Sequence, residues 1–263
     1  MHPILKKKGF IIDLDGVIYK GETPIQSGIK AIRKLKKLNK KIIFVSNNST
    51  RSRRTVLRKL KKLGLEVSKD EVLLATYATA RFISKEKKNA KIFTTGEPGL
   101  IEELKLANLK IVDYNKAEYL VVGSNKKINF ELMTKALRAC LSGLRYISVN
   151  PDRFSPGSEG PVPGTGMIIG ALYWMTGRKP DVIIGKPSKI LIKEALEILN
   201  LRPKDVVVVG DQIDIDIAVG RKVGAKTLLV LTGVTTNSNL NKMKKRFKEK
   251  PDYVLNNLGD LFG

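Results

Sequence analysis

The stretch from residue 10 to residue 16 constrains this chain more than any other. Three bulky apolar residues at 10–12 lead directly into two carboxylates, Asp13 and Asp15, and then Gly16. An apolar run of this kind predicts a buried strand, and the aspartates and glycine mark its end. Ionised carboxylates beside a core are costly unless a cation or a hydrogen-bond network balances them. The stretch therefore predicts a strand that ends in a metal site or a shared proton, with a plain surface turn as the alternative.

Strand and helix patterns alternate after this stretch. A helical pattern at 25–38 is followed by an apolar strand at 41–45, and a second helical pattern at 51–63 stops before Gly64. Strand, helix, strand and helix in this order predict an α/β fold with a parallel, Rossmann-like sheet and right-handed crossovers.

Apolar strands return near the end of the chain, at 181–184, 205–209 and 226–231. Unbroken β-branched runs are typical of strands buried on both faces, so we expect these three to complete the sheet that begins at residue 10. The predicted core domain therefore comprises residues 1–78 and 181–263.

Residues 79–180 are predicted to form a separate inserted α/β module. Its expected strands lie near 91–93, 110–112, 119–122 and 146–149, and its expected helices lie near 99–107 and 130–141. Residues 150–164 are rich in Pro, Gly and Ser, which predicts a long irregular loop. The next helix contains Met167, Leu172, Trp174 and Met175, which we expect to pack in a core.

Composition excludes several kinds of chemistry. The only cysteine is Cys140, so no internal disulfide can form, which fits a reducing cytoplasm, and its helical context favours a buried structural thiol. The only histidine is His2, which excludes a mechanism with a histidine base or a multi-histidine zinc site. No apolar run approaches the roughly 20 residues that a membrane span needs, and the start lacks the pattern of a secretory signal.

The formal net charge is +24, and the excess is concentrated early. Residues 1–64 contain 18 lysines and arginines against three acidic residues. Nucleic acid is one partner that such a charge could attract. However, the lysines at 30–37 alternate with apolar positions, which favours the solvated faces of amphipathic helices. We interpret the run 242–250 in the same way, and expect the overall field to steer small anions such as phosphate esters.

Polar residues follow the predicted strands of the core. Because sites in open parallel sheets lie beyond the carboxyl ends of the strands, we expect these residues to converge. The set comprises Asp13, Asp15, Ser46, Asn47, Lys186, Asp211, Asp214 and Asp216. Carboxylates without histidine or cysteine partners are typical of a hard cation such as Mg²⁺, whereas a lysine and a hydroxyl suit a phosphoryl oxygen.

These residues resemble the four ordered motifs of the haloacid dehalogenase superfamily of phosphatases, over nearly the whole chain. The motifs are Asp13-Leu14-Asp15-Gly16-Val17, Ser46-Asn47-Asn48, Gly185-Lys186-Pro187, and Gly210-Asp211 with Asp216. The segments 46–49, 150–152, 163–166 and 231–233 are similar to the NagD-like, p-nitrophenyl phosphatase-like subclass IIA. That subclass carries a large α/β cap between the second and third motifs, where the inserted module is predicted.

The resemblance implies a role for each matched residue. Asp13 would be the nucleophile that forms a phosphoaspartyl intermediate, and Asp15 would protonate the leaving oxygen and later activate water. Mg²⁺ would be held by the side chains of Asp13 and Asp211 and by the backbone carbonyl of Asp15. The remaining matches divide into the phosphate-binding residues Ser46, Asn47 and Lys186 and the supporting residues Asn48, Gly210 and Asp216.

One departure from the family pattern concerns the fourth motif. Many relatives carry threonine where this chain has Ile215, and an additional carboxylate stands at Asp214. The resemblance assigns Asp216 by its spacing and leaves the role of Asp214 open. The segment 164–170 is one residue too long for a dinucleotide fingerprint and follows a loop instead of a strand.

The sequence thus predicts a cytoplasmic, Mg²⁺-dependent phosphomonoester hydrolase that acts on a small phosphorylated metabolite. The alternatives are phosphoryl transfer to an acceptor other than water and a basic nucleic-acid-binding protein. Nucleic acid and membranes are not the expected partners. Pairing with a second copy through the cap, which relatives often show, stays open.

Overall fold

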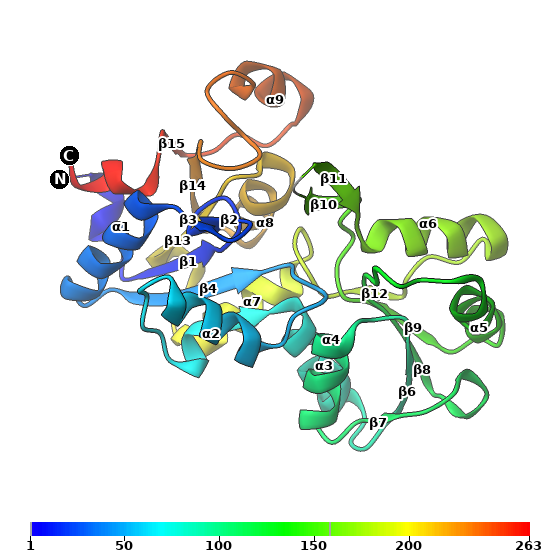
Figure 1. Cartoon of the computed structure of the whole chain (residues 1–263). Coiled ribbons are helices and arrows are strands. Elements are labelled where there is room, and N and C mark those ends of the chain that lie inside the picture. Colours follow the sequence, from blue (N-terminus) through cyan, green and yellow to red (C-terminus); the bar gives the residue numbers. More distant parts are fainter. Residues whose placement is uncertain (1, 158) are drawn as a thin grey trace. The chain divides into compact units, whose positions relative to one another are not determined.

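Residues 9–13 form a strand at the centre of a parallel sheet, as their apolar run predicts (Figure 1). The computed structural model describes residues 2–157 and 159–263, which form two compact units. The first unit comprises Met1–Ser46, Leu57–Leu73 and Lys186–Gly263, and the second comprises Asn47–Val56 and Leu74–Gly185. The chain passes between the two units near residues 73 and 185, whereas the sequence placed the domain boundaries at 78 and 180. Residues 47–56, however, group with the second unit.

The first unit contains a sheet of six strands in the order β15-β14-β13-β1-β4-β5. The central strand β1 pairs in parallel with β13 on one side and with β4 on the other. The pairing of β1 with β13 confirms that strands far apart in sequence share this sheet, and all five residues of each strand are buried. The strands are β1 (Gly9–Asp13), β4 (Lys41–Ser46), β5 (Val72–Leu74), β13 (Val206–Gly210), β14 (Lys226–Val230) and β15 (Tyr253–Leu255).

The helices of this unit are amphipathic. Helix α1 buries Ile29, Ile32 and Leu35, whereas Lys30 and Lys37 on its other face are exposed, which confirms the solvated-face interpretation. The helices are α1 (Gln26–Lys37), α2 (Arg53–Lys62, whose first turn groups with the second unit), α7 (Lys189–Leu199), α8 (Ala218–Val223) and α9 (Leu240–Arg246). A small antiparallel hairpin, β2 (Tyr19–Lys20) and β3 (Thr23–Pro24), follows β1. The short helices are η1 (Pro3–Lys6), η2 (Lys69–Glu71), η4 (Pro203–Asp205), the π-helix η5 (Ile213–Ile217) and η6 (Leu258–Phe262).

The second unit has its own sheet of five parallel strands, in the order β12-β9-β8-β6-β7. The strands are β6 (Lys91–Thr94), β7 (Lys110–Ile111), β8 (Tyr119–Val122), β9 (Arg145–Ser148) and β12 (Val182–Ile183). The helices are α3 (Ala75–Glu86), α4 (Pro98–Leu106), α5 (Phe130–Leu141), α6 (Thr165–Thr176) and the short η3 (Tyr114–Lys116). These bounds confirm the strands and the two helices expected between 91 and 149.

Two expectations about this region are wrong. The strand at 181–184 does not join the first sheet, because β12 pairs with β9 at Val182–Ile147 in the second. The short apolar run of this strand does not indicate which of the two sheets it joins. Residues 150–164 are not irregular throughout, because β10 (Phe154–Gly157) pairs with β11 (Gly160–Pro163) in an antiparallel hairpin. Ser158 of this predicted loop lies outside the described residues.

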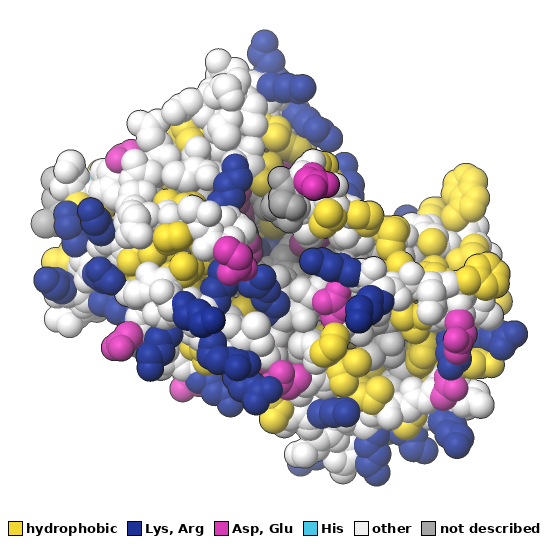
Figure 2. Space-filling model, in the orientation of Figure 1, with side chains coloured by type: hydrophobic (Ala, Val, Ile, Leu, Met, Phe, Trp, Pro, Cys, Tyr) yellow, Lys and Arg dark blue, Asp and Glu magenta, His cyan; other side chains and the backbone are white. Residues whose placement is uncertain are grey.

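Helix α6 differs from its expected packing. Leu172 is fully buried, but Trp174 is 89% exposed and Met167 and Met175 are also exposed. Figure 2 shows hydrophobic side chains at the surface where α5 and α6 lie. Because α6 is apolar on nearly every side, its sequence does not indicate which face packs. The buried position of Cys140 in α5, by contrast, confirms the structural thiol.

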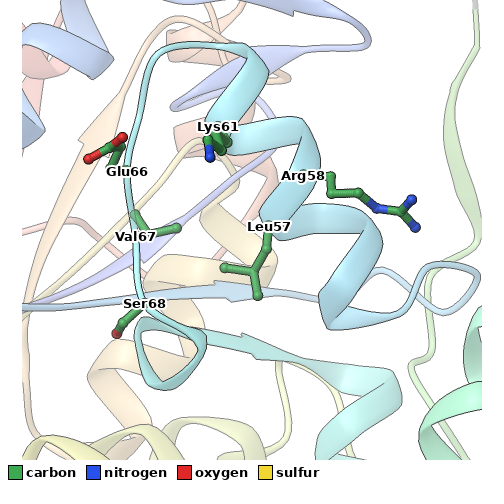
Figure 3. A pocket seen from close by; sticks show the side chains of 6 residues that line it. All are labelled: Leu57, Arg58, Lys61, Glu66, Val67 and Ser68. Carbon is green, nitrogen blue, oxygen red and sulfur yellow. The ribbon is translucent and has the colours of Figure 1, made fainter.

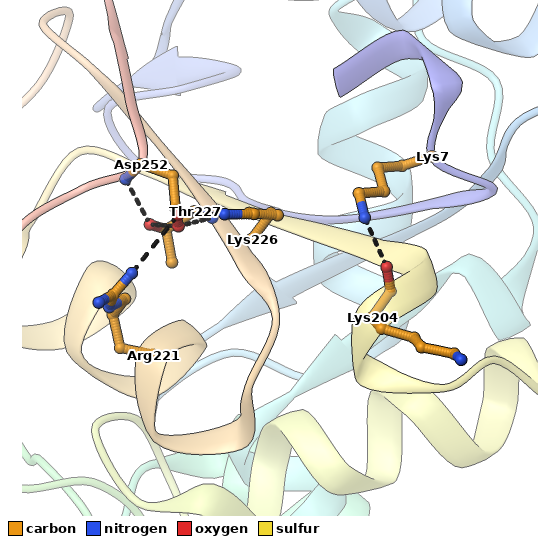
Figure 4. A network of polar contacts seen from close by, with 6 residues as sticks. All are labelled: Lys7, Lys204, Arg221, Lys226, Thr227 and Asp252. Atoms are coloured by element: carbon orange, nitrogen blue, oxygen red, sulfur yellow. Dashed lines mark hydrogen bonds and ion pairs between the residues drawn. The ribbon is translucent and has the colours of Figure 1, made fainter. Parts of the chain in front are cut away.

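A polar network joins β14 to the segment that precedes β15 (Figure 4). Lys226 Nζ donates to Asp252 Oδ1 at 2.7 Å, and the backbone N and Oγ1 of Thr227 donate to Asp252 Oδ2 at 3.0 and 2.8 Å. Burial opposes ionisation of Asp252, but the hydrogen bonds from Lys226 and Thr227 outweigh it and lower its pKa. The carboxylate therefore stabilises the edge of the sheet in its ionised form.

Asp252→Asn is expected to lower the free energy of unfolding by about 2 kcal/mol at pH 7, because charge-assisted hydrogen bonds are lost. A lowered folded pKa contributes stability above the unfolded pKa of about 3.9 and loses it as the pH falls through the folded value. The difference from the wild type should therefore shrink in acid. Urea unfolding at pH 7 and pH 3.5 measures it, with the exposed Asp70→Asn as control. An undiminished difference at low pH would contradict the ionic explanation.

Within residues 2–157 and 159–263, no helix combines the length and apolar character needed to cross a membrane.

Candidate active site

The first site residues lie where β1 ends. Asp13 is the last residue of β1, and the chain turns sharply after it, with Ile18 N donating to Leu14 O at 2.9 Å and Gly16 N donating to Tyr19 O at 2.8 Å. Gly16 has φ +79°, and a Cβ there would lie 2.5 Å from Asp211 Oδ2. Glycine is thus required both by the backbone conformation and by the approach of a second carboxylate.

Lys186 joins two carboxylates from different strand ends. Its Nζ donates to Asp13 Oδ1 at 2.5 Å and to Asp216 Oδ1 at 2.6 Å, and its side chain is only 3% exposed. A lysine is almost never buried so completely unless it is paired. The expected convergence of Asp13, Lys186 and Asp216 is therefore present within the first unit, although β12, the strand before Lys186, belongs to the second sheet.

Asp216 reaches this position through the turn after β13. Gly210 ends β13, and a Cβ on it would lie 2.1 Å from Asp216 Cγ. Gln212 N donates to Asp216 Oδ2 at 3.1 Å, and the π-helix η5 carries residues 213–217 around the strand end. Gly210 is thus needed because the carboxylate occupies the space of a side chain.

The third carboxylate belongs to Asp211. Val234 N donates to its Oδ2 at 2.5 Å, while its buried Oδ1 has no hydrogen-bond partner among the described residues. Carboxylate oxygens of Asp13, Asp211 and Asp216 all lie within 4.8 Å of one another. An unpaired buried oxygen in a cluster of hard oxygen donors fits a divalent cation, so the residues present can hold a metal ion.

The electrostatics of the cluster agree with this fit. Burial raises the pKa of Asp13 well above its ordinary value, against the opposing attraction of Lys186. Burial and the nearby Asp216 charge raise the pKa of Asp211 to about 7. Burial acts to lower the pKa of Lys186, but Asp13 and Asp216 together outweigh it and raise that pKa. The lysine therefore stays charged, and a further cation would favour ionisation of the aspartates.

The second predicted motif is divided between the two units. Ser46 ends β4, is buried, and directly follows Val45, the residue that pairs with Asp13. Asn47 begins the second unit, where its Nδ2 donates to Asp152 Oδ1 at 2.9 Å.

Asn48 has a local structural role. Its Oδ1 accepts hydrogen bonds from Thr50 N at 3.0 Å and Arg51 N at 2.7 Å, which fixes the turn before α2. The structure thus brings Ser46 to the edge of the sheet that carries Asp13. The side chain of Asn48, in contrast, binds backbone N–H groups of the turn before α2.

Two other predicted acids lie outside the carboxylate cluster. Among the described residues, the cluster comprises three aspartates, and neither Asp15 nor Asp214 is one of them. Asp15 is partly buried and forms a β-bridge with Tyr19.

Sequence reasoning from the residues missed the loop after β14. Thr232 Oγ1 donates to Gly16 O at 2.5 Å, Val234 N binds Asp211 Oδ2, and Thr235 N donates to Asp211 O at 3.1 Å. The loop therefore connects the turn after β1 to Asp211. The only sequence signal was the Thr-Gly pair that ends an apolar strand.

A shallow pocket elsewhere in the first unit contains none of these residues (Figure 3). It lies between α2 and the segment that follows, and its lining residues are Leu57, Arg58, Lys61, Glu66, Val67 and Ser68. The side chains of Arg58 and Glu66 extend in opposite directions, so the pocket does not gather reactive groups (Figure 3).

Comparison with known proteins agrees with the geometry. A model of haloacid dehalogenase-like hydrolases matches residues 10–110, and a second, HAD-hydrolase-like model matches residues 183–261. A solved p-nitrophenyl phosphatase from Archaeoglobus fulgidus is 68% identical, with a TM-score of 0.96 over 97% of this chain and 98% of that one.

Two curated bacterial relatives are similar over nearly their whole length. An acid sugar phosphatase from Staphylococcus haemolyticus is 36% identical over 95% of this chain and 94% of its own length. The 5'-nucleotidase YutF from Bacillus subtilis is 34% identical over 95% and 96%. The chain therefore belongs to the haloacid dehalogenase-like hydrolases and is a phosphatase of their NagD-like, p-nitrophenyl phosphatase-like subclass IIA.

Proposed function

We propose that this phosphatase hydrolyses small phosphomonoesters with Mg²⁺, through a covalent phosphoaspartate on Asp13. The observation that carries the proposal is the cluster in which Lys186 lies 2.5 Å from Asp13 and three carboxylates approach within 4.8 Å. A carboxylate held beside a fixed cation is suited to attack a phosphoryl group whose negative charge the same cation balances.

The reaction would proceed in two displacements. An oxygen of Asp13 attacks phosphorus, the bond to the ester oxygen breaks, and Asp15 donates a proton to the departing alcohol. Asp15, now ionised, removes a proton from water, whose oxygen attacks phosphorus and releases inorganic phosphate from Asp13. Asp15 thereby regains its proton, and Asp13 its free carboxylate. The partly buried position of Asp15, two residues after the nucleophile, supports this assignment.

The remaining residues would bind the phosphoryl oxygens and the metal. Lys186 would balance the charge of the phosphoryl oxygens, with Ser46 and Asn47 as hydrogen-bond donors. Asp216 and Gly210 would support Lys186, and Asn48 the turn that follows Ser46. Mg²⁺ would be held by Asp13, Asp211 and the Asp15 carbonyl, and when bound it supplies positive charge that offsets repulsion between carboxylate and phosphate.

The two units would divide the work, the first as the catalytic core and the second as the cap that selects the alcohol. We expect the enzyme in the cytoplasm, because its single buried cysteine fits a reducing compartment. The relatives are named for sugar phosphates and for 5'-nucleotides, so both classes are candidate substrates.

A substrate panel tests the proposal. Purified protein with Mg²⁺ is expected to release phosphate from p-nitrophenyl phosphate and, with a higher kcat/KM, from a member of a panel of sugar phosphates and nucleoside monophosphates. Chelation should stop the release, and Mg²⁺ should restore it. Activity that persists in chelator would refute the metal requirement. Phosphorylated acceptor in place of free phosphate would show a phosphotransferase.

Mg²⁺ is also expected to raise the Tm of the protein, by several degrees at 100 times its Kd, because binding to the folded state adds about 2.7 kcal/mol. Asp211→Asn should abolish this increase and, without metal, should not lower the Tm, since it removes a buried carboxylate that lacks a partner for Oδ1. Thermal unfolding with and without Mg²⁺ measures both effects. The exposed Asp70→Asn, as control, should keep the full increase. An increase that survives Asp211→Asn would place the metal elsewhere.

A further inference from the structure

Lys59 of α2 is a buried cation outside the carboxylate cluster. It is 7% exposed, whereas Lys61 and Lys62, which follow it on the same helix, are exposed. Burial of a lysine is costly unless its ammonium group is compensated. The proposed mechanism gives this residue no role, so its partners need an explanation.

Among the described residues, the contacts of the Lys59 ammonium group are with the hairpin β2–β3. Lys59 Nζ donates to Gly21 O at 2.5 Å and to Glu22 Oε1 at 3.2 Å. The same nitrogen lies 3.7 Å from the centre of the Tyr19 ring, which is the geometry of a cation–π contact. Tyr19 is itself only 3% exposed. Lys59 therefore fastens the hairpin to α2 by three contacts from one nitrogen, all within the first unit.

The hairpin leads directly to Asp15. Tyr19 forms a β-bridge with Asp15, and its carbonyl accepts the hydrogen bond of Gly16 N at 2.8 Å. The strands of the hairpin have two residues each, and a two-stranded hairpin is marginally stable at best by itself. The backbone on both sides of Asp15 thus depends on a small element that needs an external anchor.

We propose that Lys59 is a positioning residue, which holds the hairpin and through Tyr19 fixes Asp15 where it can protonate the leaving alcohol. The inference rests on the proposed function, in which Asp15 is the acid. Lys59 touches neither Asp13 nor Lys186 in any described contact, so its loss should affect proton delivery and leave phosphoryl binding in place.

The test compares two leaving groups. A nitrophenolate leaves readily without a proton, whereas an alkoxide needs one, so loss of the acid slows alkyl esters more. The quantity is kcat/KM for p-nitrophenyl phosphate divided by kcat/KM for the best alkyl phosphate of the panel. This ratio reports the first displacement alone, because kcat/KM does not include the later hydrolysis of the phosphoaspartate.

Lys59→Met, which keeps the apolar stem, is expected to raise this ratio about tenfold, and Asp15→Asn about a hundredfold. Lys62→Met on the exposed face of α2 is the matched control and should leave the ratio unchanged. Should Lys59→Met fail to fold, Lys59→Gln keeps a donor for Gly21 O and tests the same ratio.

The outcomes separate the two proposals. Suppose that Asp15→Asn raises the ratio but the Lys59 variants leave it unchanged, either because they slow both esters equally or because they slow neither ester. Lys59 is then only structural, and the inference is wrong. If Asp15→Asn itself leaves the ratio unchanged, Asp15 is not the acid, and the proposed mechanism and the inference are both overturned.

Discussion

Asp13→Asn is expected to lower kcat/KM for p-nitrophenyl phosphate by at least about 10⁴-fold, the scale on which loss of a covalent nucleophile acts. An amide has nearly the shape of the carboxylate but is not a nucleophile toward phosphorus. Its oxygen can still accept the hydrogen bond that Lys186 donates to Asp13 Oδ1. The variant should therefore fold and bind Mg²⁺ weakly or not at all, while acid-quenched samples contain no phosphorylated protein.

Asp214→Asn is the matched comparison for this variant. Asp214 lies near the same end of the sheet, but outside the carboxylate cluster of the described residues. It is expected to keep kcat/KM within about threefold of the wild type, since its carboxylate is not one of the three that form the cluster. Circular dichroism checks the fold of both variants. Substantial turnover in Asp13→Asn would falsify the nucleophile assignment, and a large loss in Asp214→Asn would add this acid to the site.

Lys186→Met is expected to lower the free energy of unfolding by about 3 to 5 kcal/mol, because removal of one partner leaves buried charges uncompensated. Lys186 is 3% exposed, and its Nζ contacts Asp13 and Asp216. Attraction to these carboxylates raises its pKa in the folded protein. A lysine with a raised folded pKa stabilises fully below its unfolded pKa of about 10.4 and ceases to do so only as the pH rises through the folded value. The full loss is therefore expected at pH 7.

Urea unfolding at pH 7 in chelator measures this loss. Lys189→Met, an exposed lysine at the start of α7, is the control and should change stability by less than about 0.5 kcal/mol. The Lys186 variant should also lose phosphatase activity, because it lacks the ammonium group that would balance the charge of the phosphoryl oxygens. A Lys186→Met protein as stable as the control would contradict the stabilising role of the two ion pairs.

The sequence predicted the parts of the fold where periodicity is strong. The predictions are confirmed for strands β1, β4, β13 and β14 and for helix α1. In each of these elements the order of apolar and polar residues indicates which positions are buried. Helix α3 and strand β5 were not predicted from residues 72–86, a stretch of small and mixed residues with a weak period. The hairpin β10–β11 was missed because its strands contain prolines and glycines, which in sequence-based prediction indicate turns and loops.

The sequence did not determine which sheet the strand at 181–184 joins. Residues 182–183 have the apolar character of a core strand, yet they pair with β9 of the second unit. Similarly, Trp174 and Leu172 lie on the same apolar helix, and only one of them is buried. In both cases the local sequence pattern is compatible with either arrangement. Contacts with residues far away in the sequence decide which sheet the strand joins and which side chain is buried.

For the site, the sequence by itself determined which side chains follow the strands and that parallel pairing of β1 with β13 brings Asp13 and Asp211 to one edge. Only the tertiary structure decided the partners: that Lys186 bridges Asp13 and Asp216, that the loop after β14 binds Asp211, and that Lys59 anchors the hairpin beside Asp15. The reason is physical. A strand end is set by a few neighbouring residues, whereas these hydrogen bonds join positions that are tens to about two hundred residues apart and exist only once the sheet has formed.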